Sequence, residues 1–186
     1  LQWLKNVAKR NGVALPSGTC LELGAGVGRM TLALASEFDS VLAVDVSPGN
    51  LAECDAMLEA KGIDNVQTKL VSGLEEIESL PEIDFFYSVI VLQHNPPPII
   101  YFILNKILGK IRKNGAVYFQ VPTHFPNYSF DARQYLKTET LEMDMHAIPM
   151  RNVFALFKTN GLTPLEVMQD NWTGAPGSHT FIATKT

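Results

Sequence analysis

The sequence lacks the features that mark several classes of protein. It has 2 cysteines among 186 residues, no block of lysines or arginines, and no apolar run near the ~20 residues of a membrane-spanning helix. No histidine–cysteine cluster has the spacing of metal ligands. The net charge is −4, which disfavours a nucleic-acid substrate held through its phosphates. We therefore expect no metal site, no membrane span and no nucleic-acid partner.

The two cysteines are predicted to be small apolar core residues. Cys20 lies in an apolar strand and Cys54 in a probable helix, which suits a reducing compartment. No secretory signal is visible, so the prediction for localisation is cytoplasmic. The length fits one domain over residues 1–186. The chain begins at Leu1 within an amphipathic pattern, which leaves open that it is part of a longer protein.

The most informative stretch is residues 20–35. Residues 20–23 read as a buried strand, residues 24–28 as a glycine-rich turn, and a helix follows from Gly28. The free amide groups and the positive dipole end of that helix would face the turn. A second acid, Asp45, closes the next apolar run, where it could hold ribose hydroxyls.

The spacing of the glycines discriminates between ligands. A dinucleotide-binding strand–helix turn has the pattern G-x-G-x-x-G, and here its third glycine falls on Arg29. The pattern present is acid-x-G-x-G-x-G, from Glu22 to Gly28. In this motif, and in the acid at the end of the second strand, the chain resembles the class I S-adenosylmethionine-dependent methyltransferases. The run from Asp84 through an apolar strand to His94 resembles that family's fourth motif.

Strands and helices are predicted to alternate along most of the chain. We expect strands at 20–23, 41–44, 66–71, 84–92, 116–121, 162–168 and 180–184, with a turn at Asn114 and Gly115. This order favours an α/β doubly wound sheet that ends in a hairpin. The resemblance implies a mostly parallel seven-stranded sheet whose last strand is antiparallel. The predicted site lies at the carboxyl ends of the strands, where four loops converge.

The resemblance assigns roles to residues on these loops, with S-adenosyl-L-methionine as the cofactor. Asp45 would bind the ribose hydroxyls, the backbone near Gly24 and Gly26 the methionine part, and Val46 would flank the adenine. Glu22 would act near the amino group and Arg29 near the carboxylate. Ser72 stands where many members have an aspartate, so adenine recognition would involve Ser72, Gly73 and Leu74. The remaining implied cofactor-binding residues are Ala25, Gly28, Leu92 and Gln93. An N-terminal helix would partly cover the cofactor, with Trp3 in contact.

The acceptor side is predicted from residues 122–148. This aromatic-rich stretch has no sustained period and is too long for a simple connection, so we interpret it as an insertion folded over the carboxyl edge of the sheet. The resemblance implies that it covers the acceptor, because the family adds acceptor-binding elements at this place. An acceptor that must lose a proton needs a base, and histidine is suited to that role. His94 is the first choice, and His124 and His146 lie in the insertion.

Three functions remain open at this point. The first is methyl transfer from S-adenosylmethionine to a small-molecule acceptor. The second is a nicotinamide-dependent oxidoreductase, against which the missing third glycine argues. The third is a catalytically silent cofactor-binding module of a larger protein. Neither the acceptor, the methylated atom nor the oligomeric state follows from the sequence.

Overall fold

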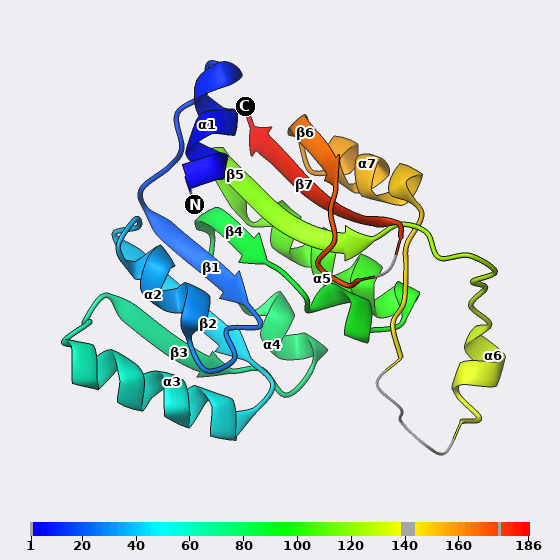
Figure 1. The fold of residues 1–186 in the computed structure, drawn as a ribbon, viewed down its shortest axis with the longest axis horizontal. Coiled ribbons are helices and arrows are strands. Elements are labelled where there is room, and N and C mark those ends of the chain that lie inside the picture. The colour runs from blue at the N-terminus through cyan, green and yellow to red at the C-terminus, as the bar shows by residue number, and fades with distance from the viewer. Residues whose placement is uncertain (1, 139–143, 175) are drawn as a thin grey trace.

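The computed structural model describes residues 2–138, 144–174 and 176–186, and within them one seven-stranded sheet carries the fold. The strand order is β3-β2-β1-β4-β5-β7-β6 (Figure 1). The strands are β1 (Thr19–Leu23), β2 (Ser40–Asp45), β3 (Val66–Leu70), β4 (Ile83–Ser88), β5 (Ile111–Pro122), β6 (Leu162–Gln169) and β7 (Ser178–Lys185). The first five are parallel to one another, and β7 pairs antiparallel with both β5 and β6. The predicted fold class, including the antiparallel C-terminal hairpin, is confirmed.

Helices cover both faces of this sheet. α1 (Gln2–Arg10), α2 (Arg29–Ala35) and α3 (Pro48–Lys61) lie on one face, called here the front face. α4 (Leu74–Glu78), α5 (Pro97–Gly109) and α7 (Met150–Thr159) lie on the back face (Figure 1). The 3-10 turn η1 (Leu92–His94) follows β4, and α6 (Ala132–Tyr135) lies in the predicted insertion. Among the described residues, no helix combines the length and apolar character needed to cross a membrane.

Local sequence signals explain where α3 begins and ends. Ser47 caps the helix, because its hydroxyl accepts a hydrogen bond from the Asn50 amide at 3.2 Å, and Pro48 occupies the first helical position. Gly62 ends the helix with φ of +64°, the left-handed conformation that glycine adopts most readily. These signals fix the entry of the chain into α3 directly after Asp45.

A separate apolar core fills each side of the sheet. On the back face Phe119 contacts the rings of Phe86, Phe157 and Phe181. On the front face the ring of Phe38 stacks on that of Phe85 at 4.9 Å. Both cores hold the strands in register and so fix where their carboxyl ends lie.

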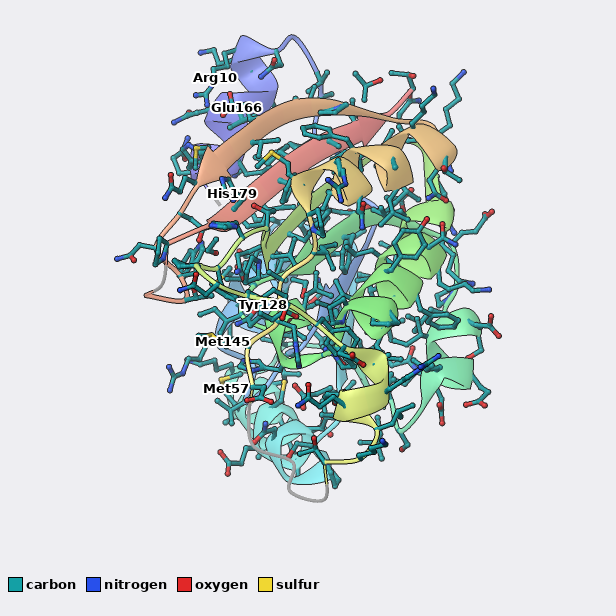
Figure 2. All side chains as sticks on the ribbon, turned by 90° about the vertical axis from the view of Figure 1, so that its right-hand side faces the viewer. Arg10, Met57, Tyr128, Met145, Glu166 and His179 are labelled. Carbon is teal, nitrogen blue, oxygen red and sulfur yellow. The ribbon has the colours of Figure 1, made fainter. Side chains whose placement is uncertain are left out.

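α1 is attached to the front face away from the predicted cofactor residues. Arg10 forms an ion pair with Glu166 of β6, and both are labelled in Figure 2. The Trp3 ring lies edge-on to the ring of Tyr118 in β5, with 5.9 Å between centroids. Trp3 therefore packs on the sheet in this structure.

Two predicted boundaries were wrong. The strand predicted over 84–92 ends at Ser88, because Ile90 has φ of +60° and turns the chain out of the sheet before η1. The turn predicted at Asn114 and Gly115 lies inside β5: Asn114 has φ of +64°, and the pairing with β4 shifts register there. Hydrophobicity alone does not reveal either change of direction.

Candidate functional site

The glycine turn is fastened to the end of the neighbouring strand. The amides of Gly24 and Ala25 both donate to the Val44 carbonyl, at 2.8 and 3.0 Å. Gly24 has φ of +82°, and a Cβ built on it would lie 2.1 Å from Cγ2 of Val91. Only glycine can therefore stand here while Val91 packs against the turn. The turn thus places bare backbone at the carboxyl end of β1.

Asp45 joins the turn to the second strand. Its Oδ2 accepts a hydrogen bond from the Gly26 amide at 2.8 Å, and its Oδ1 accepts one from the Ser47 amide at 2.8 Å. Each carboxylate oxygen can accept a further hydrogen bond. The half-buried carboxylate is therefore held in one orientation with acceptor capacity to spare.

A cleft of about 590 Å³ opens at these carboxyl ends. Four connections of the sheet contribute to it, those after β1, β2, β3 and β4, and α5 adds apolar side chains. Its lining residues are Leu23, Gly24, Asp45, Val46, Asn50, Val71, Ser72, Gly73, Leu74, Ile77, Ile90, Val91, His94, Asn95, Ile99 and Ile103. The loops predicted to converge do so, and the cleft has the size and the mostly apolar walls of a small-ligand site.

The family-model comparison matches residues 20–115, about half of the chain, to a model described as a methyltransferase domain. This chain belongs to the methyltransferase domain family. The predicted resemblance to class I S-adenosylmethionine-dependent methyltransferases is confirmed, and S-adenosylmethionine is the cofactor that the family uses.

Solved methyltransferases share the fold over almost the whole chain. An S-adenosylmethionine-dependent methyltransferase from Clostridium acetobutylicum is 12% identical with a TM-score of 0.70, and the match covers 99% of this chain and 89% of that one. Magnesium protoporphyrin IX methyltransferase from Synechocystis with bound S-adenosylhomocysteine is 16% identical with a TM-score of 0.68, covering 100% and 79%. At these identities the likeness shows the fold.

Curated relatives match over a shorter stretch. A tRNA/tmRNA (uracil-C(5))-methyltransferase from Photorhabdus laumondii is 35% identical over 80 residues, which are 43% of this chain and 20% of that protein. The corresponding protein from Klebsiella pneumoniae is 34% identical over 93 residues, or 45% and 24%. This methyltransferase domain thus aligns with about a fifth to a quarter of the length of those relatives.

The methyltransferase domain brings about half of the predicted cofactor residues into the cleft. Those that line it are Gly24, Asp45, Val46, Ser72, Gly73 and Leu74, and the predicted base His94 lines it too. The others do not: Ala25, Gly26 and Gly28 form the turn, and Arg29 is exposed at the start of α2. Leu92 and Gln93 are buried in η1, and Gln93 Oε1 has no hydrogen-bond partner within the described part of the chain.

Glu22 of β1 contacts α2, the helix on the other side of the glycine turn. Its side chain is buried, and its Oε2 accepts a hydrogen bond from the Thr31 hydroxyl at 2.6 Å. Burial raises the pKa of Glu22 to about 7; the Thr31 hydrogen bond opposes this rise, and the negative charge of Asp45 adds to it. Glu22 therefore changes charge near neutral pH.

The other two predicted histidines do not line the cleft. His124 is exposed near the start of the insertion. His146 is buried, its Nδ1 shares a hydrogen bond with the Tyr128 hydroxyl at 2.9 Å, and its amide donates to the Gln93 carbonyl at 2.7 Å. Burial lowers the pKa of His146, so the neutral form is favoured.

Several cleft residues were missed by sequence reasoning. Ile90 and Val91 were assigned to a strand, and Ile99 and Ile103 lie on the helix whose apolar stripe reads as core. Asn50 and Asn95 had a usable signal, because each is a polar residue shortly after a motif at a strand end. The four apolar residues carry no such mark, since core and ligand-facing isoleucines look alike in sequence.

The residues present fit the family cofactor. The fixed carboxylate of Asp45 suits a pair of vicinal hydroxyls, and the apolar wall from Val46 to Ile103 suits a flat base. The open side of Gly26, where an added Cβ would meet nothing within 4 Å, leaves the turn accessible. Among the described residues, no group of three or more acidic, histidine or cysteine side chains could hold a metal ion.

Proposed function

We propose that this chain binds S-adenosylmethionine in the cleft and catalyses transfer of its methyl group to a small-molecule acceptor in the cytoplasm. The observation that carries the proposal is the Asp45 carboxylate, held by the Gly26 and Ser47 amides at a cleft formed by four strand ends. Residues 1–186 act as a single domain in this proposal.

When bound, S-adenosylmethionine supplies a methyl group on a sulfonium that is already activated for displacement. The protein then has to bind the cofactor and the acceptor, orient them for displacement, and exclude water. Asp45 would accept hydrogen bonds from the ribose hydroxyls, and the backbone at Gly24 and Gly26 would hold the methionine part. Val46 and Leu74 of the cleft would flank the adenine, and Ser72 would hydrogen-bond its edge. Glu22 would hold β1 and α2 together across the glycine turn through Thr31, and Arg29 would lie near the carboxylate of the methionine part.

His94 is the proposed general base for an acceptor that must lose a proton. It lines the cleft, and its Nε2 lies 3.5 Å from Nε2 of Gln93, at the outer limit of a hydrogen bond. Because an amide NH2 group only donates, a hydrogen bond here uses the lone pair on His94 Nε2, and the base role requires this long bond to give way to the acceptor's proton. His146 is less suited, because the rings of Tyr128, Phe130 and Tyr135 enclose it. His124 remains a prediction for the same role.

The insertion over residues 122–148 is the proposed acceptor cover. It leaves the sheet at the carboxyl end of β5 (Figure 1), and on its return the His146 amide donates to the Gln93 carbonyl of η1. A small-molecule acceptor is favoured because the net charge is −4 and no basic block is present. An RNA acceptor is the second candidate, favoured by the partial matches to tRNA/tmRNA methyltransferases.

Thermal shift with S-adenosylhomocysteine tests the proposal. A ligand at a hundred times its dissociation constant stabilises by ~2.7 kcal/mol, so we expect Tm to rise by about 5 to 10 °C. Asp45→Ala should reduce the affinity at least tenfold, since hydrogen bonds to a charged group contribute ~1.5–3 kcal/mol each. The matched control is Glu59→Ala, an exposed acid of α3, which should bind like wild type.

The outcomes separate the candidate functions. A shift with a nicotinamide dinucleotide instead would support an oxidoreductase, and no shift with either ligand would support a catalytically silent module. Incubation with methyl-labelled S-adenosylmethionine and either a metabolite extract or total tRNA should label small molecules. Label in the tRNA alone would contradict the small-molecule acceptor.

A further inference from the structure

The connection after β4 adopts a conformation that its sequence does not favour. Ile90 has φ of +60°, in the left-handed region, where a β-branched residue is a rare outlier. Such conformations persist only where the surrounding structure enforces them, and they gather at functional sites. The side chain of Ile90 is 44% exposed and lines the cleft. The strained conformation of Ile90 therefore directs its apolar side chain to the wall of the cleft.

One buried side chain holds Ile90 in place. Gln120 of β5 is 0% exposed, and its Oε1 accepts a hydrogen bond from the Ile90 amide at 2.9 Å. Its Nε2 donates to the Ser178 hydroxyl at 2.8 Å, at the first residue of β7. β5 lies between β4 and β7 in the sheet (Figure 1), so Gln120 connects the end of one neighbour to the start of the other.

The hydrogen bond to Gln120 replaces one that the sheet no longer supplies. The pairing of β4 with β5 ends at Ser88 and Phe119, so the Ile90 amide has no strand carbonyl opposite it. With Ile90 turned outward, the next residue, Val91, packs on Gly24 at the glycine turn. The same connection thus contacts both the turn and the cleft.

We infer that Gln120 is a positioning residue: it clamps Ile90 in the left-handed conformation, and Ile90 is a specificity-determining wall of the cleft. The ligand part of this inference rests on the proposed function, and the backbone part does not. Gln120 itself does not line the cleft, so it acts through Ile90. The clamp keeps the cleft at its present width in the absence of ligand.

The backbone part is tested by melting two variants without ligand. At an ordinary position glycine is less stable than alanine, but at positive φ alanine keeps the strain and glycine removes it. We expect Ile90→Gly to melt above Ile90→Ala by about 2 to 4 °C. Gln120→Leu should also lower Tm less in the Ile90→Gly background than in wild type, because glycine needs no clamp. Alanine melting at or above glycine would overturn the clamp.

The ligand part is tested by calorimetry with S-adenosylhomocysteine. Gln120→Leu should weaken binding about tenfold or more. Ser178→Ala, which removes the other hydrogen bond of Gln120, should change it less than about threefold. Val117→Ala, a buried residue on the opposite face of β5, controls for lost stability and should bind like wild type.

The two failures are distinguishable. Equal affinity in the Gln120→Leu and Val117→Ala variants would overturn the positioning role, even if the melting order held. Absence of S-adenosylhomocysteine binding to wild type would overturn the proposed function and the ligand part together. The order of melting of the two Ile90 variants would still decide the backbone part.

Discussion

Glu22 and Asp45 are two acids of one site with different environments. Glu22 is buried with a hydroxyl as its hydrogen-bond donor, whereas Asp45 is half-buried and receives two backbone amides. Burial disfavours an ionised carboxylate. Burial thus makes Glu22 titratable near neutral pH, whereas the two amides fix the orientation of the Asp45 carboxylate.

Stability should depend on pH through Glu22. Its pKa is raised from 4.5 to about 7, so between these values the folded state holds a proton that the unfolded state has lost. The free energy of unfolding should therefore fall as pH rises from 4.5 to about 7, by up to roughly 3 kcal/mol. Urea unfolding at pH 5 and pH 8 measures this difference.

Glu22→Gln is the matched variant for this measurement, because glutamine keeps an acceptor for Thr31 and cannot titrate. It should lose most of the difference between pH 5 and pH 8. A variant with the same difference as wild type would show that other groups carry the pH dependence.

At the scale of elements, a backbone hydrogen bond between described residues ties the insertion to the connection after β4. The His146 amide bonds the Gln93 carbonyl of η1, and the rings of Tyr128, Phe130 and Tyr135 surround its imidazole. Tyr128 and Met145 are labelled on this segment in Figure 2. We interpret the Tyr128 hydrogen bond and these rings as fixing His146, whose amide joins the insertion to the connection after β4.

Loss of the His146 side chain should expose the insertion to proteolysis. His146→Ala keeps the amide bond to Gln93 but removes the hydrogen bond to Tyr128, worth ~0.5–1.5 kcal/mol, so cleavage by trypsin after Arg133 or Lys137 should be roughly 3- to 10-fold faster. Mass spectrometry of timed digests identifies the sites. His124→Ala, at an exposed histidine of the same segment, should digest like wild type, and equal rates in both variants would show that the His146 side chain does not hold the insertion.

At the scale of the whole molecule, the sheet divides the interior into two apolar cores. Phe157 of α7 is 1% exposed and contacts ring neighbours on β5 and β7, so it joins a back-face helix to the strands behind the site. Phe154 on the same helix is 39% exposed. The two residues differ in burial and share an element, which makes them a matched pair.

Phe157→Ala should lower the free energy of unfolding by about 3–5 kcal/mol, the usual cost of emptying a buried aromatic site. Phe154→Ala should cost about 1 kcal/mol, since much of its surface is already in water. Denaturant titrations measure both values. Similar losses in the two variants would mean that the exposed face of α7 contributes as much as the buried one.

Local signals were enough for the strand, turn and helix of residues 20–35, for Asp45 and for the Ser47–Pro48 cap. Glycine spacing, a capping residue and an apolar run act between near neighbours in the chain, so the sequence by itself determined them and the family that they indicate. The antiparallel hairpin followed from the order of elements and from the resemblance.

Only the tertiary structure decided which apolar side chains form the walls of the cleft. The sequence pattern predicts that Ile90 belongs to a strand. In the structure it lies outside the sheet, and its amide donates a hydrogen bond to Gln120, 30 residues further on. Likewise, the sequence offers His146 as a candidate base, whereas in the structure rings from its own insertion enclose it. Each of these outcomes depends on hydrogen bonds and packing between segments that are distant in sequence, and no local pattern records which partner a side chain will meet.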